Sequence, residues 1–146
     1  MKNIDILLLS WKDAASEAFS IRKAVFIEEQ NVPEELELDE FDAQAMHALL
    51  KFNNQSIGTA RLVDLPNGQA QIGRMAVLPQ YRGQGFGKQI LVRMILAARE
   101  KGITSLMLHS QVSAVRFYEK LGFIAQGAIY DEAGIPHRNM MLELLK

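Results

Sequence analysis

Residues 73–88, with the sequence GRMAVLPQYRGQGFGK, combine an apolar stretch, an arginine and three glycines at alternating positions. An amphipathic pattern typical of a helix follows them. Glycine lets the backbone approach a ligand closely, and the first N–H groups of a helix have no partner within it. Because the positive end of the helix dipole also favours anions, this segment predicts a strand, a phosphate-binding loop and a helix N-terminus. We therefore expect the chain to bind a phosphorylated cofactor.

Two common phosphate-binding motifs do not fit this loop. The Walker motif needs Gly-x-x-x-x-Gly-Lys-Ser/Thr, but Arg82 stands five residues before Gly87, and Gln89 stands where serine or threonine is needed. The dinucleotide fingerprint G-x-G-x-x-G also fails, because the spacing here is G-x-G-x-G. Both failures argue against a nucleoside triphosphate enzyme. The pattern that fits is Arg-x-x-Gly-x-Gly, and a glycine-rich turn before an ordinary helix is the alternative.

The Arg-x-x-Gly-x-Gly pattern of residues 82–87 resembles the acetyl-coenzyme A loop of the GNAT N-acetyltransferase superfamily. A second segment, residues 114–123 with the sequence AVRFYEKLGF, is similar to the A-x-x-F-Y-x-x-x-G-F segment of the same superfamily. Further segments, which include residues 22–30, 58–61 and 134–137, resemble its small ElaA/YjcF-type bacterial branch. The resemblance covers nearly the whole chain and implies acyl transfer from acetyl-coenzyme A (acetyl-CoA).

The resemblance also implies a role for each part of the cofactor site. The amides of residues 83–88 and the side chain of Arg82 would hold the pyrophosphate. The backbone of residues 75–77 would pair with pantetheine as an added strand does, and one of its N–H groups would polarise the thioester carbonyl. Gln111 stands where the family often has asparagine, and its amide is expected to reach the pantetheine arm. The expected cofactor-binding residues are Met75, Ala76, Val77, Arg82, Gly83, Gln84, Gly85, Phe86, Gly87, Lys88, Gln111 and Tyr118.

Tyr118 is the expected catalytic acid. In the family, the tyrosine at this position hydrogen-bonds the cofactor sulfur and protonates the leaving thiolate. A phenol suits this role because it stays protonated at neutral pH and can donate. The alternative is a helix tyrosine that packs with Phe117 on the core.

Several residues are candidates for the general base. An amine attacks only when it is neutral, so a group of the enzyme must take its proton, directly or through water. Glu29 shares a partly apolar helix face, where burial would raise its pKa toward a useful range; a surface carboxylate or a partner for Arg22 is the alternative. His109 ends a strand that, by resemblance, faces the acyl cleft. The alternative is a histidine whose hydrogen bonds are satisfied within the protein. The other candidates are Asp39, Asp42, His47 and His137.

The distribution of charge bears on the acceptor. Residues 1–64 hold 6 lysines and arginines against 12 acidic residues, whereas residues 65–146 hold 10 against 5. A basic half suits an anionic cofactor, and an acidic half attracts a cationic amine such as a polyamine, an aminoglycoside-like amine, a lysine side chain or a peptide N-terminus. A solvated acidic loop, or ion pairs with Arg61 and Arg74, is the alternative. By resemblance, the acceptor side is expected to hold Glu29, Asp39, Asp42, His47, Arg74 and His137.

Composition limits the remaining classes of protein. The 146 residues suit one domain, residues 1–146, with one core. The chain has no cysteine, which excludes disulfides and a thiolate metal site, and it has no close His-x-x-x-His pair that would predict a metal centre. The net charge of −1 argues against nucleic-acid binding, and no run approaches the roughly 20 apolar residues of a membrane span. We expect a cytoplasmic protein; because dimers are common in the superfamily, a homodimer through the first helix or the final strands is left open.

The elements that position these residues alternate between strands and helices. Asp13 is the candidate N-cap of the first helix, and residues 132–136 are the expected link between the last two strands. By resemblance, the strand before the glycine loop diverges from the next one and opens a V-shaped cleft for the acyl chain. Strands are expected at residues 4–9, 46–52, 56–63, 69–78, 104–109, 123–130 and 137–144. Helices are expected at residues 13–29, within 33–45, from 86 to a cap at Gly102, and at 113–121.

This order predicts an α+β (mixed α/β) fold, with a mixed, mostly antiparallel sheet of about six or seven strands flanked by about four helices. It matches the GNAT-like acyl-CoA N-acyltransferase fold. We therefore predict an acetyl-CoA-dependent N-acetyltransferase that moves an acyl group to a primary amine by direct attack, without a covalent enzyme intermediate. Tyr118 would act as the acid, and Glu29 or His109 as the base. The alternative is a non-catalytic acyl-CoA-binding or sensing module, which needs no base and no open acceptor site.

Overall fold

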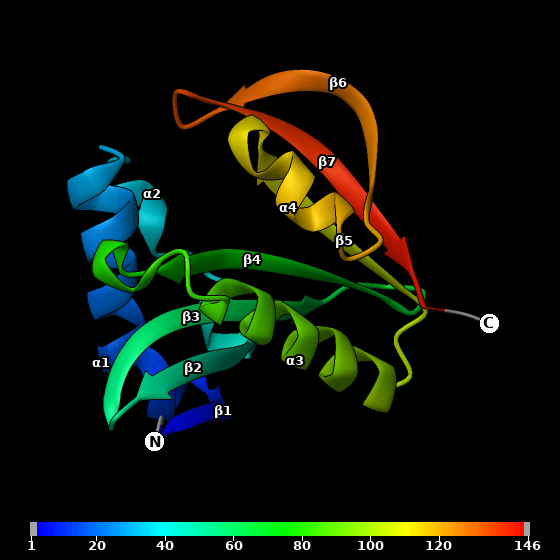
Figure 1. Cartoon of the computed structure of the whole chain (residues 1–146). Coiled ribbons are helices and arrows are strands. Elements are labelled where there is room, and N and C mark those ends of the chain that lie inside the picture. The colour runs from blue at the N-terminus through cyan, green and yellow to red at the C-terminus, as the bar shows by residue number, and fades with distance from the viewer. Residues whose placement is uncertain (1–2, 145–146) are drawn as a thin grey trace.

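The computed structural model describes residues 3–144, which form one seven-stranded sheet covered by helices on both faces (Figure 1). The strands lie in the order β1-β2-β3-β4-β5-β7-β6, and each neighbouring pair is antiparallel except β4 and β5. The strands are β1 Ile4–Ser10, β2 Met46–Phe52, β3 Gln55–Asp64, β4 Gln69–Val77, β5 Ser105–Gln111, β6 Ile124–Glu132 and β7 Ile135–Glu143. The α-helices are α1 Trp11–Arg22, α2 Glu34–Glu37, α3 Phe86–Glu100 and α4 Val115–Glu119. The predicted element order and the predicted mixed sheet are confirmed.

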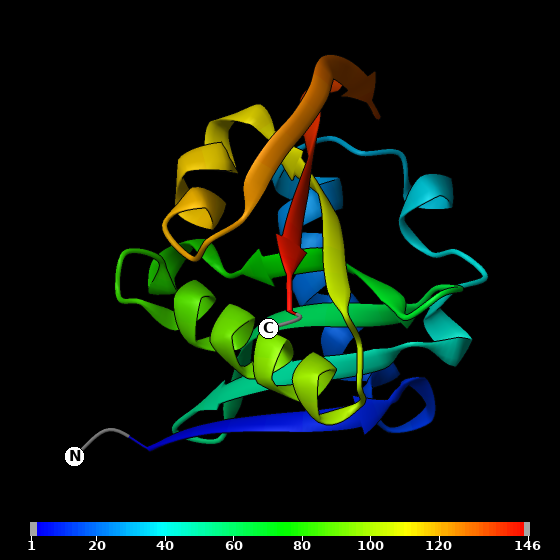
Figure 2. The same cartoon turned by 90° about the vertical axis from the view of Figure 1, so that its right-hand side faces the viewer.

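Two apolar clusters hold the helices against the sheet. Figure 2 shows α3 and α4 on one face and α1 on the other. In the larger cluster, Ile90 and Met94 of α3 are buried with residues of the central strands; they lie four residues apart and so share one face of the helix. In the smaller cluster, Ala18 and Ile21 of α1 pack with Leu49 of β2. The central strands are therefore covered on both faces, and the ends and edges of the sheet remain free for a site.

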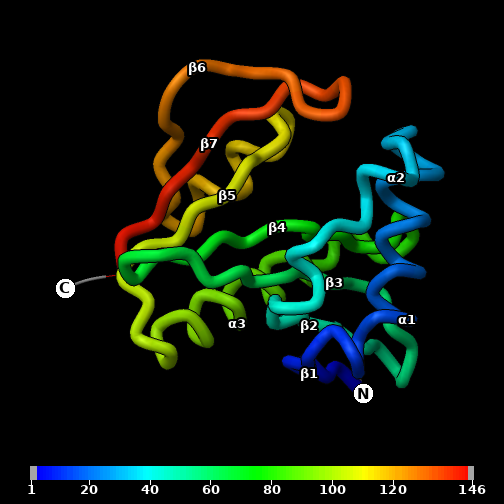
Figure 3. The backbone as a smooth tube through the Cα atoms, turned by 180° about the vertical axis from the view of Figure 1, so that it is seen from behind, coloured from blue at the N-terminus to red at the C-terminus, as the bar shows by residue number. Residues whose placement is uncertain are grey.

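Strand β4 separates from β5 half-way along its length. The parallel pairing begins with Gln69 opposite Ser105 and ends with Ile72 opposite Leu108. Beyond that point β5 pairs only with β7, as far as Gln111, while β4 stays paired with β3. Figure 3 shows β5 and β7 rising away from β4. The divergence expected by resemblance is confirmed, and it leaves one backbone edge of β4 without a strand partner.

A bulge in β4 lies at the point of divergence. The pairing of β4 with β3 shifts between Thr59 and Arg61, and Arg74 on the bulged strand has a positive φ of 50°. A bulge bends its strand and increases the local twist. A non-glycine residue in this backbone region is strained, and such residues cluster at functional sites. The second half of β4 is therefore bent just where β5 leaves it.

The first helix begins earlier than predicted and changes character before its end. α1 starts at Trp11 with Ser10 as its N-cap, so the prediction of Asp13 at that position is wrong. Serine directly after a strand is a favoured N-cap, and Asp13 instead lies in the first turn, where it faces the positive end of the helix dipole. After Arg22 the chain continues as a π-helix, η1, from Lys23 to Glu29. Such wide turns are rare and frequently occur at functional sites.

The turn between β6 and β7 is tighter than predicted. Glu132 pairs directly with Ile135, so Ala133 and Gly134 alone form the turn, and the expected link over residues 132–136 is too long. Both turn residues have positive φ, 53° and 80°, as the two-residue type I′ hairpin requires. Glu132 therefore belongs to a strand and has a fixed position beside β7.

Gly58 of β3 lies in close contact with α3, and this contact can be tested. A Cβ at Gly58 would come within 2.7 Å of Ile90 Cδ1. We expect Gly58→Ala to lower the free energy of unfolding by about 1–3 kcal/mol, because a packed core does not absorb an extra methyl group without strain. Ile90→Val in the same chain removes Cδ1 and should recover part of the loss. A double-mutant cycle by urea denaturation measures this, and additive losses would contradict it.

Candidate active site

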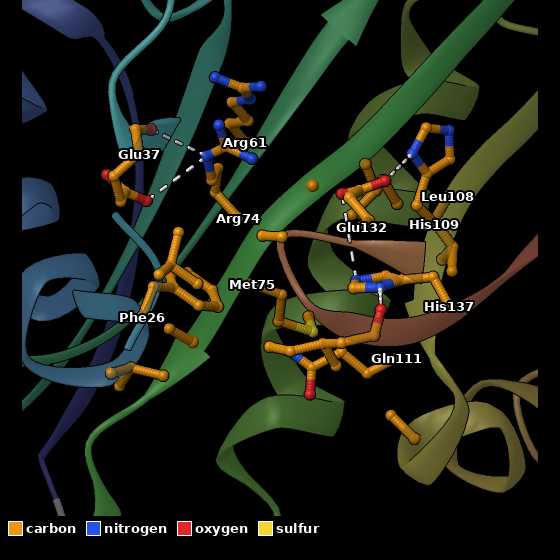
Figure 4. A pocket seen from close by; sticks show the side chains of 18 of the residues that line it. Phe26, Glu37, Arg61, Arg74, Met75, Leu108, His109, Gln111, Glu132 and His137 are labelled. Atoms are coloured by element: carbon orange, nitrogen blue, oxygen red, sulfur yellow. Dashed lines mark hydrogen bonds and ion pairs between the residues drawn. The ribbon is translucent and has the colours of Figure 1, made fainter. Parts of the chain in front are cut away.

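An open cleft with a volume of about 680 Å³ lies where β4 and β5 separate. Its walls come from η1, α2, the second half of β4, the end of β5, α4 and the β6–β7 turn. Figure 4 shows side chains from these distant segments gathered around one space. The predicted site residues that line the cleft are Asp39, Arg74, Met75, Ala76, Val77, Arg82, His109, Gln111, Tyr118 and His137.

The glycine loop follows Arg82 and leads into α3. Gly83 and Gly85 have φ values of 78° and 85°, and a Cβ on either residue would meet no atom within 4 Å. The first hydrogen bond of α3 joins the Gln89 N–H to the Gly85 carbonyl, so the N–H groups of residues 86–88 have no partner within the helix. Open space beside free N–H groups, at the positive end of a helix dipole, fits a phosphate group.

The side chains of the loop divide into anchors and exposed groups. Phe86 is buried in the larger core cluster, so only its backbone is available to a ligand. Gly87 packs near Phe117, whose Cζ would lie 3.6 Å from a Cβ on the glycine. Gln84 and Lys88 are exposed. The side chain of Phe86 thus anchors the loop in the core, and the glycines leave open space on its other side.

Arg82 is paired with Glu29 of η1. Its Nη1 and Nη2 donate to the two oxygens of Glu29 at 2.8 and 2.7 Å, and its Nε donates to the Val77 carbonyl at 2.9 Å. Hydrogen bonding to Arg82 holds the pKa of Glu29 below its usual value and raises the pKa of Arg82. The prediction that burial raises the pKa of Glu29 is therefore wrong, and its partner is Arg82 rather than Arg22. A carboxylate with a lowered pKa is a weaker base.

Tyr118 lies on α4 with its hydroxyl beside β4. The hydroxyl donates to Met75 Sδ at 3.6 Å, and the ring packs edge-on against Phe117 and Phe123. Burial raises the pKa of Tyr118 to about 12, so the phenol stays protonated at physiological pH. Because a thioether is a weak acceptor, the proton is available to a stronger one. Tyr118 therefore packs on the core, as the alternative predicted, and also lines the cleft.

Glu132 lies between two histidines on the opposite wall (Figure 4). His109 Nδ1 lies 3.1 Å from Glu132 Oε1, and since an ionised carboxylate only accepts, this nitrogen donates. His137 Nδ1 donates to the Ile135 carbonyl at 2.7 Å, and its Nε2 lies 4.0 Å from Glu132 Oε2. In the neutral form, each imidazole then has an Nε2 that can accept a proton. This wall of the cleft can therefore take a proton from an amine.

Three arginines and three carboxylates form a cluster at the far end of the cleft: Arg22, Glu37, Asp39, Asp42, Arg61 and Arg74. Arg22 is 1% exposed and donates to both Glu37 and Asp42. Burial disfavours the charge of Asp42, but its hydrogen bonds and charge interactions with Arg22 and Arg61 are stronger and lower its pKa. Ion pairs of Arg61 and Arg74 with the acidic segment, the alternative left open by the sequence, are confirmed. The three carboxylates are consequently not free to attract a cationic amine.

Two of the predicted acceptor residues lie beneath the cleft instead of in it. Asp42 is 3% exposed and His47 is 1% exposed. His47 Nε2 donates to the Asp42 carbonyl at 2.9 Å, and its ring packs against Trp11. These two buried side chains do not reach the cleft, so the prediction that they contact an acceptor is wrong. Both help to hold the buried cluster together.

Sequence reasoning missed Gln30 and Glu132. Gln111 Nε2 donates to Gln30 Oε1 at 2.9 Å, so these two amides connect opposite walls of the cleft across 81 residues of sequence. The link expected over residues 132–136 includes Glu132, so the sequence prediction places this residue in a loop. The Ala133-Gly134 pair could have located it, because a two-residue turn with positive φ places the residue before it at the end of a strand.

Residues 12–144 match the family described as "Acetyltransferase (GNAT) domain". The chain belongs to this GNAT acetyltransferase family. It is an acyltransferase, and its sheet and helices form the GNAT acyl-CoA N-acyltransferase fold. Enzymes of this family take an acyl group from an acyl-CoA and pass it to an amine.

Relatives support the resemblance to the small bacterial branch. The chain is 42% identical to YyaT of Bacillus subtilis over 131 residues, which is 88% of each chain. It is 33% identical to the N-acetyltransferase YjcF of the same organism, over 89% of this chain and 93% of YjcF. The crystal structure of Escherichia coli ElaA superposes with a TM-score of 0.87, with 26% identity over 95% of this chain and 99% of ElaA.

The residues of this GNAT chain fit an acyl-CoA. The open glycine loop suits its phosphates, and the free edge of β4 suits its amide groups.

Among residues 3–144, no group of three or more histidines, cysteines or acids could hold a metal ion. Within the same residues, no helix has the length and apolar character that crossing a membrane requires.

The buried cluster predicts a large cost for removing Arg22. We expect Arg22→Met to lower the free energy of unfolding by about 3–5 kcal/mol, because Glu37 and Asp42 would be left buried and uncompensated. Lys51→Met is a matched control, since it breaks the partly exposed pair with Glu17 and should cost less than about 1 kcal/mol. Urea denaturation measures both variants. Equal small losses would show that the cluster does not hold the fold.

His47 predicts a loss of stability on acidification. Burial lowers its pKa below the ordinary value of 6.5, so the unfolded chain binds a proton at a higher pH than the folded chain does. The contribution of His47 to the free energy of unfolding is therefore complete above pH 6.5. It is lost as the pH falls from 6.5 toward the pKa of the folded state, and the free energy then changes by at most about 1.4 kcal/mol per pH unit. His47→Gln keeps a donor for the Asp42 carbonyl and should flatten that slope. An unchanged slope in urea unfolding measured at several pH values would contradict the assignment.

Proposed function

We propose that this chain is an acetyl-CoA-dependent N-acetyltransferase that acylates a primary amine by direct attack on the thioester. One observation carries the proposal: the unpaired edge of β4, Arg82 at the start of the phosphate-sized loop, and Tyr118 all border one cleft. Membership of the GNAT family supplies the class of donor and acceptor. Acetyl-CoA as the donor is the specific proposal made here.

The donor would be held by backbone groups more than by side chains. The N–H groups of residues 83–88 would bind the pyrophosphate, and the guanidinium of Arg82 would exchange Glu29 for a phosphate oxygen. The second half of β4, residues 73–77, would pair with the pantetheine amides as an edge strand pairs with a peptide. Gln111 would add an amide hydrogen bond on the other wall. Bound in this way, the donor supplies the electrophilic acyl carbon.

Tyr118 would protonate the leaving thiolate. Its burial keeps the phenol protonated, and because Met75 Sδ is only a weak acceptor, the hydroxyl can donate instead to an anionic sulfur. In the reaction, the N–C bond forms and the C–S bond breaks, so the thiolate gains a proton as the amine loses one. Tyr118 acts on the first of these two protons.

His109 would take the second proton. Glu132 accepts a hydrogen bond from His109 Nδ1 and thereby fixes the tautomer with Nε2 free, which is how a carboxylate orients a histidine base. The base is the neutral imidazole, and water can relay the proton to it. Glu29 is not proposed as the base, because its carboxylate is bound to Arg82.

Tyr118→Phe tests the proposal. We expect turnover with acetyl-CoA and an amine to fall by about 100-fold, the usual contribution of a positioned acid, while calorimetric affinity for acetyl-CoA changes little. Tyr81→Phe is the matched control, because the Tyr81 hydroxyl donates to Gln55 and does not line the cleft. Release of coenzyme A, followed with a thiol reagent, measures turnover.

Each other outcome has a distinct meaning. Equal turnover in wild type and Tyr118→Phe would remove Tyr118 from the mechanism. Saturable binding of acetyl-CoA without thiol release, with any amine offered, would favour the non-catalytic binding module. No binding would contradict the proposed donor, and turnover with a longer acyl-CoA alone would contradict the acetyl group.

A further inference from the structure

The charged cluster leaves one guanidinium partly without partners. Arg74 Nε donates to the Glu37 carbonyl at 3.1 Å, and Nη2 donates to the Leu36 carbonyl at 3.2 Å and to Asp39 Oδ2 at 3.1 Å. Among residues 3–144, no hydrogen-bond acceptor lies on Arg74 Nη1. The side chain is 24% exposed and lines the cleft. Arg74 therefore offers two open N–H donors on this wall.

Asp39 is the most exposed carboxylate of the cluster, and its oxygens have no lone pair left to accept another hydrogen bond. Its Oδ1 accepts from the Phe41 N–H at 3.0 Å and from Arg61 Nη1 at 2.7 Å. Its Oδ2 accepts from Arg61 Nη2 at 2.9 Å and from Arg74 Nη2 at 3.1 Å. An ionised carboxylate has about four lone-pair positions, and all are used. This wall therefore presents donors, although it is built from an acidic segment.

The charge of Arg74 is also incompletely balanced. The cluster as a whole holds three arginines and three carboxylates, but Glu37 lies closer to Arg22, at 3.0 Å, than to Arg74, at 3.4 Å, and Asp42 pairs with Arg22 and Arg61. Burial and the nearby charge of Arg61 lower the pKa of Arg74, as expected for a guanidinium that lacks a full counter-charge. A small anion placed on Nη1 would supply an opposite charge that offsets both effects.

The other wall carries the opposite charge. Glu132 is 43% exposed and sits beside His109, the proposed base. Figure 4 shows Arg74 on one side of β4, next to Glu37, and Glu132 on the other side, between the two histidines. The cleft thus presents an open guanidinium at one place and an open carboxylate at another. A ligand that matches both must carry a negative and a positive group.

We propose that the acceptor is an amino acid or a compound of the same amine-and-carboxylate chemistry. Its carboxylate lies on Arg74 Nη1, and its amine lies on the Glu132 carboxylate, from which water can relay a proton to His109 Nε2. This inference rests on the proposed acyl transfer. A polyamine or another purely cationic amine is disfavoured, because it would leave the Arg74 donors without a partner when the filled cleft excludes water.

The test compares each amino acid with the amine that lacks its carboxylate. L-phenylalanine is paired with 2-phenylethylamine, and L-leucine with 3-methylbutylamine, within a panel of such pairs. Thiol release from acetyl-CoA gives kcat/KM for each compound. For the best pair, we expect kcat/KM to be about 10- to 100-fold higher for the amino acid, since a guanidinium–carboxylate contact is charge-assisted.

Arg74→Gln separates this contact from general stability. We expect the amino-acid preference to fall nearly to one, because KM rises more for the amino acid than for the simple amine. Arg138→Gln is the matched control, because Arg138 Nε donates to the Gly127 carbonyl and does not line the cleft; it should keep the preference. If Arg74→Gln fails to fold, the wild-type comparison decides alone.

The inference and the proposed function fail in different ways. Equal kcat/KM for the two members of every pair in the wild type would overturn the inference and leave acyl transfer intact. A preference that persists in a folded Arg74→Gln variant would overturn the role of Arg74. Absence of thiol release with every compound of the panel would overturn the proposed function and the inference with it.

Discussion

The cleft exists because β4 has two strand partners over its first half and one over its second. Up to Ile72 the strand is bonded on both sides, and beyond Gly73 only β3 holds it. A free strand edge in a protein interior is costly unless its N–H and C=O groups find partners. The same edge therefore leaves backbone N–H and C=O groups without strand partners, and an extended, amide-bearing molecule can pair with these groups. Arg74, strained at the bend, stands where this change occurs.

Arginines of the charged cluster hold this arrangement in place. Arg22 reaches from the end of α1 to Glu37 and Asp42, and Arg74 reaches from β4 to the carbonyls of Leu36 and Glu37. The segment between α2 and β2 is thereby tied to a helix on one side and to the bent strand on the other. Removing one partner from such a cluster is expensive, so the wall of the cleft is rigid, and the few donors that remain open on it are well placed to select a ligand.

Local motifs in the sequence predict the conformation of those parts of the candidate site that depend on a few neighbouring residues. The glycine loop and the helix of Tyr118 belong to this class, because spacing along one turn or one helix determines their local structure. The pKa of Glu29 is lowered, where the sequence predicted a raised value, because its environment is set by Arg82, 53 residues away. The burial of His47 and the position of Glu132 likewise depend on strands that come together only in the folded chain. Sequence patterns predict which residues are polar and regular, but not which distant charge neutralises them.

The most direct test of the account is amide hydrogen exchange, followed by mass spectrometry, with and without acetyl-CoA. If the donor pairs with the free edge of β4 and its phosphates lie on the glycine loop, exchange should slow in peptides covering residues 73–78 and 83–88. Gly85→Glu, which places a bulky anionic side chain at a positive-φ position of the loop, should lose this protection. Saturable binding that leaves exchange in both peptides unchanged would contradict the account.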